Sequence, residues 1–301
     1  GAYNVCLGTA AGTLITTGLR NIFVGQAGYN FDAENDNLGI GHGALGGAIN
    51  GGEYNVSVGN YTLDAVTSAD SCTAVGYNAG TSVTTSIKNT LLGESAGASI
   101  TTGTGRNVAI GQNAGNAGTA LTTGHNNILI GVEAKVSAAD GSYQFVIGSN
   151  VTSAGSSATT IGYDTTEIAT NHGSASWAAV SDERYKKDIT DSTAGLTFID
   201  DLRPVTFKFK QKNELATDIY GYDADSTDTD GYTDEVAHGF IAQEIKAVLD
   251  NHPEIKAGQE IWKQGTDEKS NRQSVSHIGM IPMLVKAIQE LSAKVKALEE
   301  A

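Results

Sequence analysis

The first half of the chain repeats a short hydrophobic pattern at a nearly constant interval. The unit is Asn, then two or three apolar or small residues, then Gly, as in NIFVG ending at Gly25 and NVAIG ending at Gly111. Ten copies, some with the Asn replaced, end between Gly8 and Gly162, and 14 to 20 residues separate one from the next. Such an interval is too short for a pair of helices. Each copy therefore predicts a strand of three to four residues followed by a turn.

The alternation within each motif predicts one apolar face along these strands. Val108 and Ile110 form such a pair, and so do Ile128 and Ile130. A single coil cannot bury this face alone, so we expect stacked coils, as in a β-solenoid or β-roll, over residues 1–170. The pattern leaves open whether one chain forms the coil or three chains interleave. A coil this thin favours burial against neighbouring chains.

A different pattern begins after a junction at residues 171–180. Residues 181–301 predict an α+β domain, with a half-buried strand at Thr206–Lys210 and a helix over Phe240–Leu249 that ends before Pro253. A long C-terminal helix is expected over residues 279–300. Its heptad spacing favours a coiled coil, and a helix packed into the domain core remains the alternative. The heptad positions are Ile281, Leu284, Ile288, Leu291, Val295 and Leu298.

Composition supports two domains and excludes some classes of partner. The chain has 19 Lys and Arg against 34 Asp and Glu, a net charge of −15, and residues 1–180 hold only 4 and 11 of these. An acidic surface repels nucleic acid and anionic lipid, and no apolar run is long enough to predict membrane insertion. Cys6 and Cys72 lack the spacing of a metal site, and we expect both to be small buried apolar residues.

The acidic segment Asp223–Asp230 is the one place where the sequence suggests an ion. Its spacing misses the EF-hand pattern, so a solvated acidic loop is the expected structure and a calcium loop the alternative. His238 and His277 have no carboxylate or cysteine partner at ligand spacing, which favours a structural role for both. We therefore predict no metal and no cofactor.

The repeated motif resembles the head repeats of trimeric adhesins and the shaft repeats of phage tail fibres, over about residues 1–165. This resemblance implies an elongated homotrimeric shaft that contacts a host surface. The host receptor implied is a glycan or an outer-membrane component.

Four segments of the second half occur in the order of another family. SDERYKKDI from Ser181, LRPVTFKFK, HGFIAQE and AIQEL closely resemble the intramolecular chaperone at the C-terminus of phage endosialidase tailspikes and tail fibres. In that family the domain drives trimerisation of the preceding β-structure and then cuts itself off with a Ser-Lys dyad. Carried over to this chain, the nucleophile is Ser181, the base is Lys186 and the scissile bond is Val180–Ser181.

The implied chemistry has a physical requirement. A serine hydroxyl needs an adjacent base, and a lysine amine acts as one near neutral pH only where burial lowers its pKa. Ser181 could also cap a short helix, which does not exclude catalysis. The expected enzyme is a single-turnover serine endopeptidase with no external substrate.

The resemblances together predict a virion protein, the distal part of a tail fibre or tailspike that attaches to the host. It folds in the host cytoplasm and releases its chaperone after cleavage. One alternative is a fragment of a bacterial trimeric surface adhesin. Another is a tailspike that degrades polysaccharide, although the acidic residues of the repeats are scattered rather than paired as glycosidases require.

Overall fold

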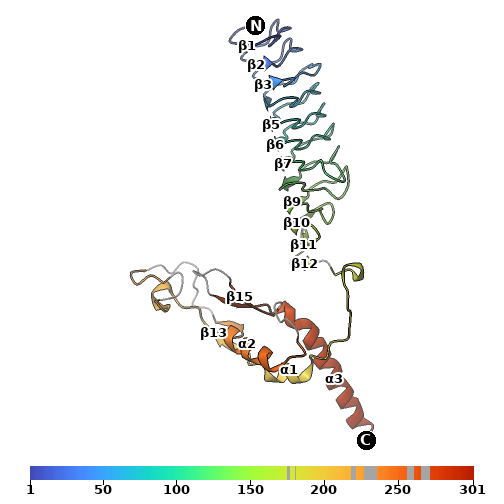
Figure 1. Cartoon of the computed structure of the whole chain (residues 1–301), viewed down its shortest axis with the longest axis vertical. Coiled ribbons are helices and arrows are strands. Elements are labelled where there is room, and N and C mark those ends of the chain that lie inside the picture. The colour runs from blue at the N-terminus through green and yellow to red at the C-terminus, as the bar shows by residue number, and fades with distance from the viewer. Residues whose placement is uncertain (175–176, 180, 218–221, 227–235, 256–260, 266–271) are drawn as a thin grey trace. The chain divides into compact units, whose positions relative to one another are not determined.

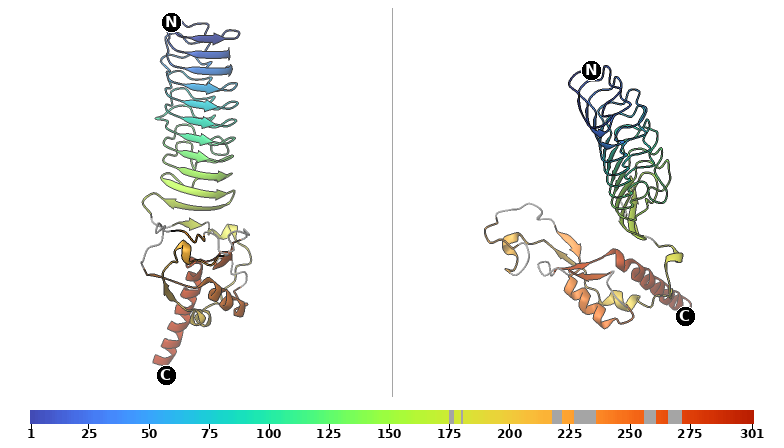
Figure 2. Two further views of the ribbon diagram at one scale, coloured as in Figure 1. Left: turned by 90° about the vertical axis from the view of Figure 1, so that its left-hand side faces the viewer. Right: turned by 45° about the horizontal axis from the view of Figure 1, so that its top comes forward.

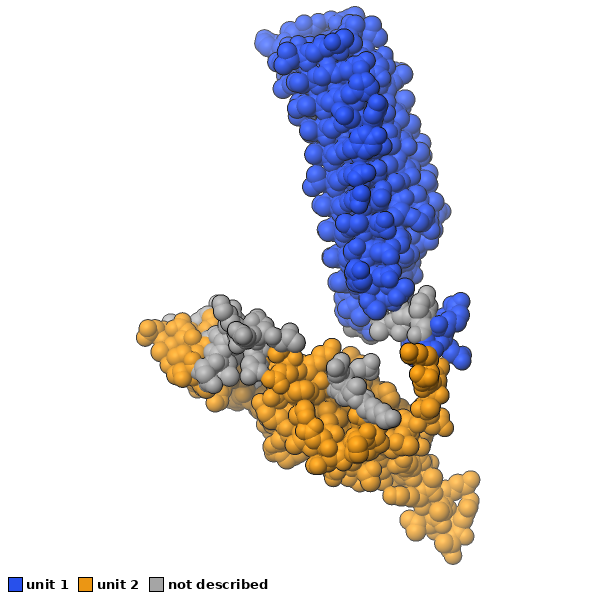
Figure 3. Space-filling view, viewed as in Figure 1, with its two compact units in different colours: residues 1–186 blue, residues 187–301 orange. Residues whose placement is uncertain are grey.

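The computed structural model describes residues 1–174, 177–179, 181–217, 222–226, 236–255, 261–265 and 272–301. The chain forms two compact units, Gly1–Lys186 and Lys187–Ala301, which Figure 3 colours separately. The first unit contains the repeats and also both residues of the predicted dyad. No helix in the described ranges has the length and apolar character needed to cross a bilayer.

The first unit is a β-solenoid, which confirms the predicted architecture (Figures 1 and 2). Each repeat motif forms one strand, and each strand pairs in parallel with the strand of the next motif. One chain therefore forms the whole coil. The parallel strands are β1 (Val5–Leu7), β2 (Ile22–Gln26), β3 (Leu38–His42), β4 (Val56–Val58), β5 (Thr73–Val75), β6 (Thr90–Leu92), β7 (Val108–Ile110), β8 (Ile128–Ile130), β9 (Phe145–Ser149) and β10 (Ala158–Tyr163).

A ladder of side-chain amides, most of them fully buried, joins successive coils. Oδ1 of a ladder Asn accepts the backbone N–H of the corresponding residue one coil later, at 2.8–3.1 Å. In most coils Nδ2 donates to the carbonyl three residues before that position, as from Asn127 to Gly141 at 2.8 Å. The side chains thus satisfy backbone groups at a corner outside the strand pairing. The ladder positions are Asn4, Asn21, Asn37, Asn55, Cys72, Asn89, Asn107, Asn127 and Gln144.

Strand side chains point alternately into the coil and away from it. The central residue is the buried one from β2 to β10, as at Ala109 and Leu129. The prediction that stacking buries Val108 and Ile110 was therefore wrong, because both flank the centre and stay partly exposed. The interior admits one side chain per strand, and large and small residues share it. The central positions are Cys6, Phe23, Gly39, Ser57, Ala74, Leu91, Ala109, Leu129, Val146 and Thr160.

The side chains that flank the central positions form a continuous surface, which we call the outer face. The residues before the centre are Val5, Ile22, Leu38, Val56, Thr73, Thr90, Val108, Ile128, Phe145 and Thr159. The residues after the centre are Leu7, Val24, Ile40, Val58, Val75, Leu92, Ile110, Ile130, Ile147 and Ile161. Both columns lack charged residues, and the second is aliphatic throughout.

The two cysteines differ in exposure, although both occupy positions that repeat along the stack. Cys72 replaces Asn in the ladder and is fully buried, as predicted, and burial raises the pKa of its thiol. Cys6 is exposed, so its predicted burial was wrong. Cys6 lies at the centre of β1, which pairs with a strand on one side only.

The parallel stack ends in antiparallel pairing. Strand β11 (Thr166–Asn171) runs back along β10, and β12 (Ala178–Ala179) pairs antiparallel with β11. The connection between β10 and β11 turns at Asp164, whose φ is 53°. The regular 17-residue coil therefore stops before residue 170.

The second unit is an α+β domain, as predicted, and its described residues form two antiparallel strand pairs and three α-helices. Phe198, Ile245, Ile261 and Met280 form its buried core. Its elements are α1 (Leu196–Asp201), β13 (Val205–Phe207), a 3₁₀ turn η2 (Lys212–Glu214), β14 (Ala237–Gly239), α2 (Ala242–Asn251), β15 (Trp262–Gln264), β16 (Gln273–Val275), a 3₁₀ turn η4 (Ile278–Met280) and α3 (Ile281–Glu299). Strands β13 and β14 pair antiparallel, as do β15 and β16.

Element bounds in this unit differ from the prediction at a few positions. The strand predicted for Thr206–Lys210 is β13, which ends at Phe207, and Phe209 beyond it is exposed. Helix α2 begins at Ala242, two residues later than expected, because Gly239 belongs to β14. The long C-terminal helix is confirmed as α3.

Candidate active site

The segment that carries the predicted dyad folds into one tight turn. Glu183–Tyr185 form the 3₁₀ turn η1, and the backbone N–H of Lys186 donates to the Glu183 carbonyl at 2.9 Å. The cap of this turn is Asp182, which accepts the N–H of Arg184 at 2.9 Å. The capping role considered for Ser181 therefore belongs to its neighbour, and the Ser181 hydroxyl is left for other contacts.

This turn brings the two predicted catalytic side chains together. Lys186 Nζ donates a hydrogen bond to Ser181 Oγ at 2.8 Å. In a neutral amine the same contact would run the other way, with the nitrogen accepting the hydroxyl proton. Both side chains are exposed in the single chain. Val180, the other side of the predicted scissile bond, lies outside the described residues.

A second charged pair is held inside the same turn. Arg184 binds the Asp182 carboxylate through Nε and Nη2, at 3.0 and 2.6 Å. These hydrogen bonds, together with the one from the Arg184 backbone, lower the pKa of Asp182. Asp182 therefore stays ionised and engaged with Arg184, while the Lys186 amine points to the serine. This Asp182–Arg184 pair was not predicted, although the S-D-x-R motif contains both residues at the required spacing.

The described part of the second unit includes a buried titratable cluster around His252. His252 follows α2 and is nearly inaccessible, with 8% of its surface exposed. Its ring nitrogens face Asp201 at 2.8 Å and Glu254 at 2.6 Å. Hydrogen bonds to these two carboxylates, that to Asp201 first, raise the pKa of His252. The cluster joins the end of α1 to the segment after α2, a structural role that the sequence analysis missed.

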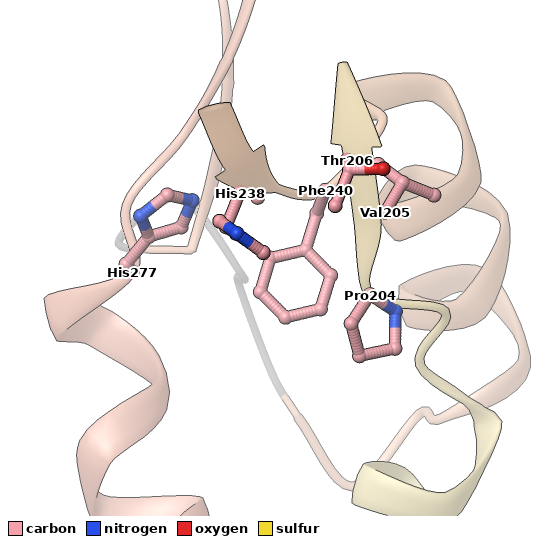
Figure 4. A pocket seen from close by; sticks show the side chains of 7 residues that line it. Pro204, Val205, Thr206, His238, Phe240 and His277 are labelled. Atoms are coloured by element: carbon pink, nitrogen blue, oxygen red, sulfur yellow. The ribbon is translucent and has the colours of Figure 1, made fainter. Parts of the chain in front are cut away.

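A cavity of about 460 Å³ lies beside the antiparallel strands β13 and β14 (Figure 4). Pro204, Thr206, His238, Phe240 and His277 are among its lining residues. The His277 ring packs edge-on against Phe240, with centroids 5.7 Å apart, in agreement with the structural role expected for this histidine. The described residues contain no group of His, Cys, Asp and Glu that could hold a metal ion.

The acidic segment Asp223–Asp230 is described only in part. Asp223 and Asp225 are exposed, as a solvated loop requires. Asp228 and Asp230 lie outside the described residues, so the calcium alternative is untested.

The C-terminal helix leaves its heptad positions in solvent. Ala287, between them, is buried, and α3 packs against α1. Glu290 of α3 accepts the first N–H of α1, from Leu196, at 2.9 Å. The heptad residues are 43% to 78% exposed, from Leu284 to Leu298. Helix α3 therefore packs against its own unit through Ala287 and Glu290, while the heptad seam itself is not part of the core of that unit.

Part of the second half matches a known protein family. Residues 181–252 match the family described as chaperone of endosialidase. The match begins at Ser181, where the composition changes. No curated protein and no solved structure matches the chain.

Members of the chaperone of endosialidase family are self-cleaving chaperone domains, so the match supports a chaperone role for this region. The match ends at His252, so α3 and its seam lie beyond it. Within the matched segment, Ser181 and Lys186 are the serine and lysine in contact. Their catalytic roles stay a prediction.

Proposed function

We propose that the chain is the distal part of a phage tail fibre or tailspike. Residues 1–180 form the shaft that attaches to a host-surface glycan or outer-membrane component, and residues 181–301 drive homotrimerisation before releasing themselves. The observation that carries this proposal is the chaperone match that begins at Ser181, directly after a repetitive β-solenoid. The mature shaft belongs to the virion, after folding in the host cytoplasm.

The turn at Ser181 supports a specific route for cleavage. The neutral Lys186 amine takes the Ser181 hydroxyl proton, and Oγ attacks the carbonyl carbon of Val180. The Val180–Ser181 C–N bond breaks, the Ser181 nitrogen takes up a proton, and Val180 is left as an ester on Oγ. One water then hydrolyses the ester, which gives a Val180 carboxylate and restores the hydroxyl of a free N-terminal serine.

Coupling to assembly follows from the exposure of this pair. In water a lysine amine holds its proton, and Ser181 and Lys186 are both exposed in the single chain. Burial between associated copies disfavours the charged form. Assembly therefore switches cleavage on, so that an unassembled chain keeps its chaperone.

The exposed seam of α3 supports association of the chaperone regions. Ile288 and Leu298 are 66% and 78% exposed, and an apolar stripe at heptad spacing is buried when helices of several copies pack together. Removal of the chaperone after assembly leaves a shaft whose lifetime depends on its unfolding barrier.

The test uses the full chain and four variants, one at Ser181 and three at its lysines. We expect the unaltered protein to yield a fragment of about 13 kDa that starts at Ser181, taking roughly 110 Da per residue. Ser181→Ala and Lys186→Ala should give no cut. Lys186→Arg should also give none, because arginine keeps the charge and a donor but does not deprotonate. Lys187→Ala changes the neighbouring exposed lysine and should cleave normally.

Intact mass under denaturing conditions measures cleavage, and light scattering of the native sample measures the number of associated chains. Cleavage by Lys186→Arg would show that the lysine only positions the serine. Cleavage at equal rates in a trimeric and a highly diluted monomeric sample would separate the chemistry from assembly. A full-length monomer at all concentrations would overturn the proposed function.

A further inference from the structure

The outer face of the solenoid is more apolar than is usual for a sheet surface exposed to solvent. Large side chains stand in solvent along its whole length, with Leu7 at 67%, Ile22 at 42%, Leu92 at 46% and Ile147 at 44% exposed. Three threonines are its only polar members, in a chain with a net charge of −15. Selection for a solvated surface would place charges at such positions, as it does elsewhere in the chain.

Exposed apolar residues recur along this face. Nine of its twenty side chains are large, apolar and at least 37% exposed: Val5, Leu7, Ile22, Ile40, Leu92, Ile130, Phe145, Ile147 and Ile161. Single apolar residues on a surface need no explanation, whereas a contiguous apolar patch marks an interaction site. The outer face therefore has the character of a protein interface.

The regular spacing of the face indicates what covers it. Its two columns repeat once per coil, at the strand spacing of about 4.8 Å, over all ten parallel strands. A partner that fits these columns along their whole length must itself repeat at the same spacing. Another copy of this solenoid does so. We propose that the outer face is the seam along which copies of this chain associate, parallel and in register.

The charges at the edges of the face fit this arrangement. One edge is formed by the residues just before the ladder positions, and the other by the residues just after the strand glycines. In the coil of β6 the first edge carries Lys88 and the second carries Glu94, both exposed. Around an axis parallel to the stack, the first edge of one copy meets the second edge of the next at the same height. Lys88 then faces Glu94 of a neighbouring copy.

In the next coil only the first edge is charged. Arg106 follows Lys88 on the first edge, and Gln112, bonded to Glu94 at 3.0 Å, follows on the second. Near the start of the stack the first-edge charges Arg20 and Asp36 pair with each other at 2.6 Å. The second edge there has Gln26 and His42 and no carboxylate.

In the coil of β6 the first edge thus carries one positive charge and the second edge one carboxylate. Opposite charges at one height favour a rotational, parallel arrangement over an antiparallel pair, which would bring like edges and different coils together. The apolar columns form the buried core of the seam, and these charged edges form its rim.

That three copies associate rests on the proposed function. That they associate through the outer face does not. The test uses the full chain with Cys6→Ser, to remove the exposed native thiol, and one new cysteine on the outer face. Val24→Cys and Ile147→Cys lie near opposite ends of the stack. In a parallel, in-register assembly each lies at the same height as its counterparts in the other copies, within reach across the seam, whereas an antiparallel pair would bring position 24 to the height of position 147.

We expect both variants to form covalent dimers under mild oxidation or with a short bismaleimide. Their rate should be roughly tenfold above that of Thr119→Cys, because cross-linking needs two cysteines close together. Thr119 is the matched control, exposed in the connecting segment of the β7 coil. Light scattering of each variant before cross-linking gives the number of chains.

Each result has a distinct meaning. Self-cross-linking at positions 24 and 147, but not at 119, supports the seam. An oligomeric mass without these cross-links, or with equal cross-linking at 119, overturns it, leaves the proposed function standing and opens the outer face to another ligand or protein. A monomeric mass for the unaltered chain overturns both.

Discussion

Substitution of Asn127 by Ala removes one step of the amide ladder. Asn127 is fully buried, its Oδ1 accepts the N–H of Gln144 at 2.9 Å, and its Nδ2 donates to the Gly141 carbonyl at 2.8 Å. Alanine offers neither group. The substitution therefore leaves a buried donor and a buried acceptor of the next coil without partners.

The expected cost follows from these two bonds. Each unsatisfied buried group destabilises the fold by about 1–3 kcal/mol, so the variant should lose about 2–6 kcal/mol locally. A coil contacts only its neighbours, so the loss should be concentrated in the coils of β8 and β9 rather than spread over the solenoid.

Amide hydrogen exchange measured by mass spectrometry resolves this local effect. A loss of 2 kcal/mol corresponds to an increase of about 30-fold in exchange for peptides covering residues 141–149. Peptides covering residues 21–60 of the same sample should keep their protection. Asn171→Ala, at an exposed position of β11, is the control. Unchanged exchange at residues 141–149, or an equal increase in the control, would show that water or backbone shifts replace the lost bonds.

Three further predictions test other features of the two units. Gly111→Ala should destabilise the solenoid by about 2–3 kcal/mol or more in chemical denaturation, because Gly111 has φ of 126° and a Cβ would lie 2.5 Å from the Gly131 carbonyl oxygen. An unchanged midpoint would contradict the close approach. Cys72→Asn should raise stability by about 1 kcal/mol in the same assay, because Asn restores the ladder acceptor and keeps a donor toward the Ser86 carbonyl, 3.3 Å from the thiol. A loss of stability would mean that the site is too small for the amide. His252→Gln should lower the thermal midpoint of the second unit at pH 5.5 but not at pH 9, since a pKa raised by folding contributes stability below the unfolded value of about 6.5 that is lost as pH rises through the folded pKa. An effect independent of pH would assign His252 to packing alone.

The repeat pattern predicted the strands well because each strand is defined by local chemistry. The Asn of the motif binds the next coil and the Gly permits its corner, so motif and strand coincide at every coil. The pattern did not predict which side is buried. In a three-residue strand such as Val108–Ile110, alternation fixes two faces without saying which one the coil encloses. The larger side chains were taken as the core, whereas the coil encloses the small central Ala109.

The candidate site was predictable only through resemblance. A spacing of five residues from Ser181 to Lys186 puts the two side chains together in neither a regular helix nor a strand. The contact depends on the η1 turn and on its Asp182 cap, and a single 3₁₀ turn has no periodicity in the sequence. The His252 cluster joins residues 51 positions apart, and no periodicity of the sequence marks such a pair.

The antiparallel return of β11 fixes where growth of the stack stops. A strand that runs backwards gives a following coil no parallel template, so the length of the solenoid is set by the number of motifs up to and including that of β10. Each motif adds one strand spacing, about 4.8 Å. Duplication or deletion of a segment of about 17 codons would therefore lengthen or shorten the solenoid by one coil. The antiparallel strands at its end, and the region that matches the chaperone family, would stay unchanged.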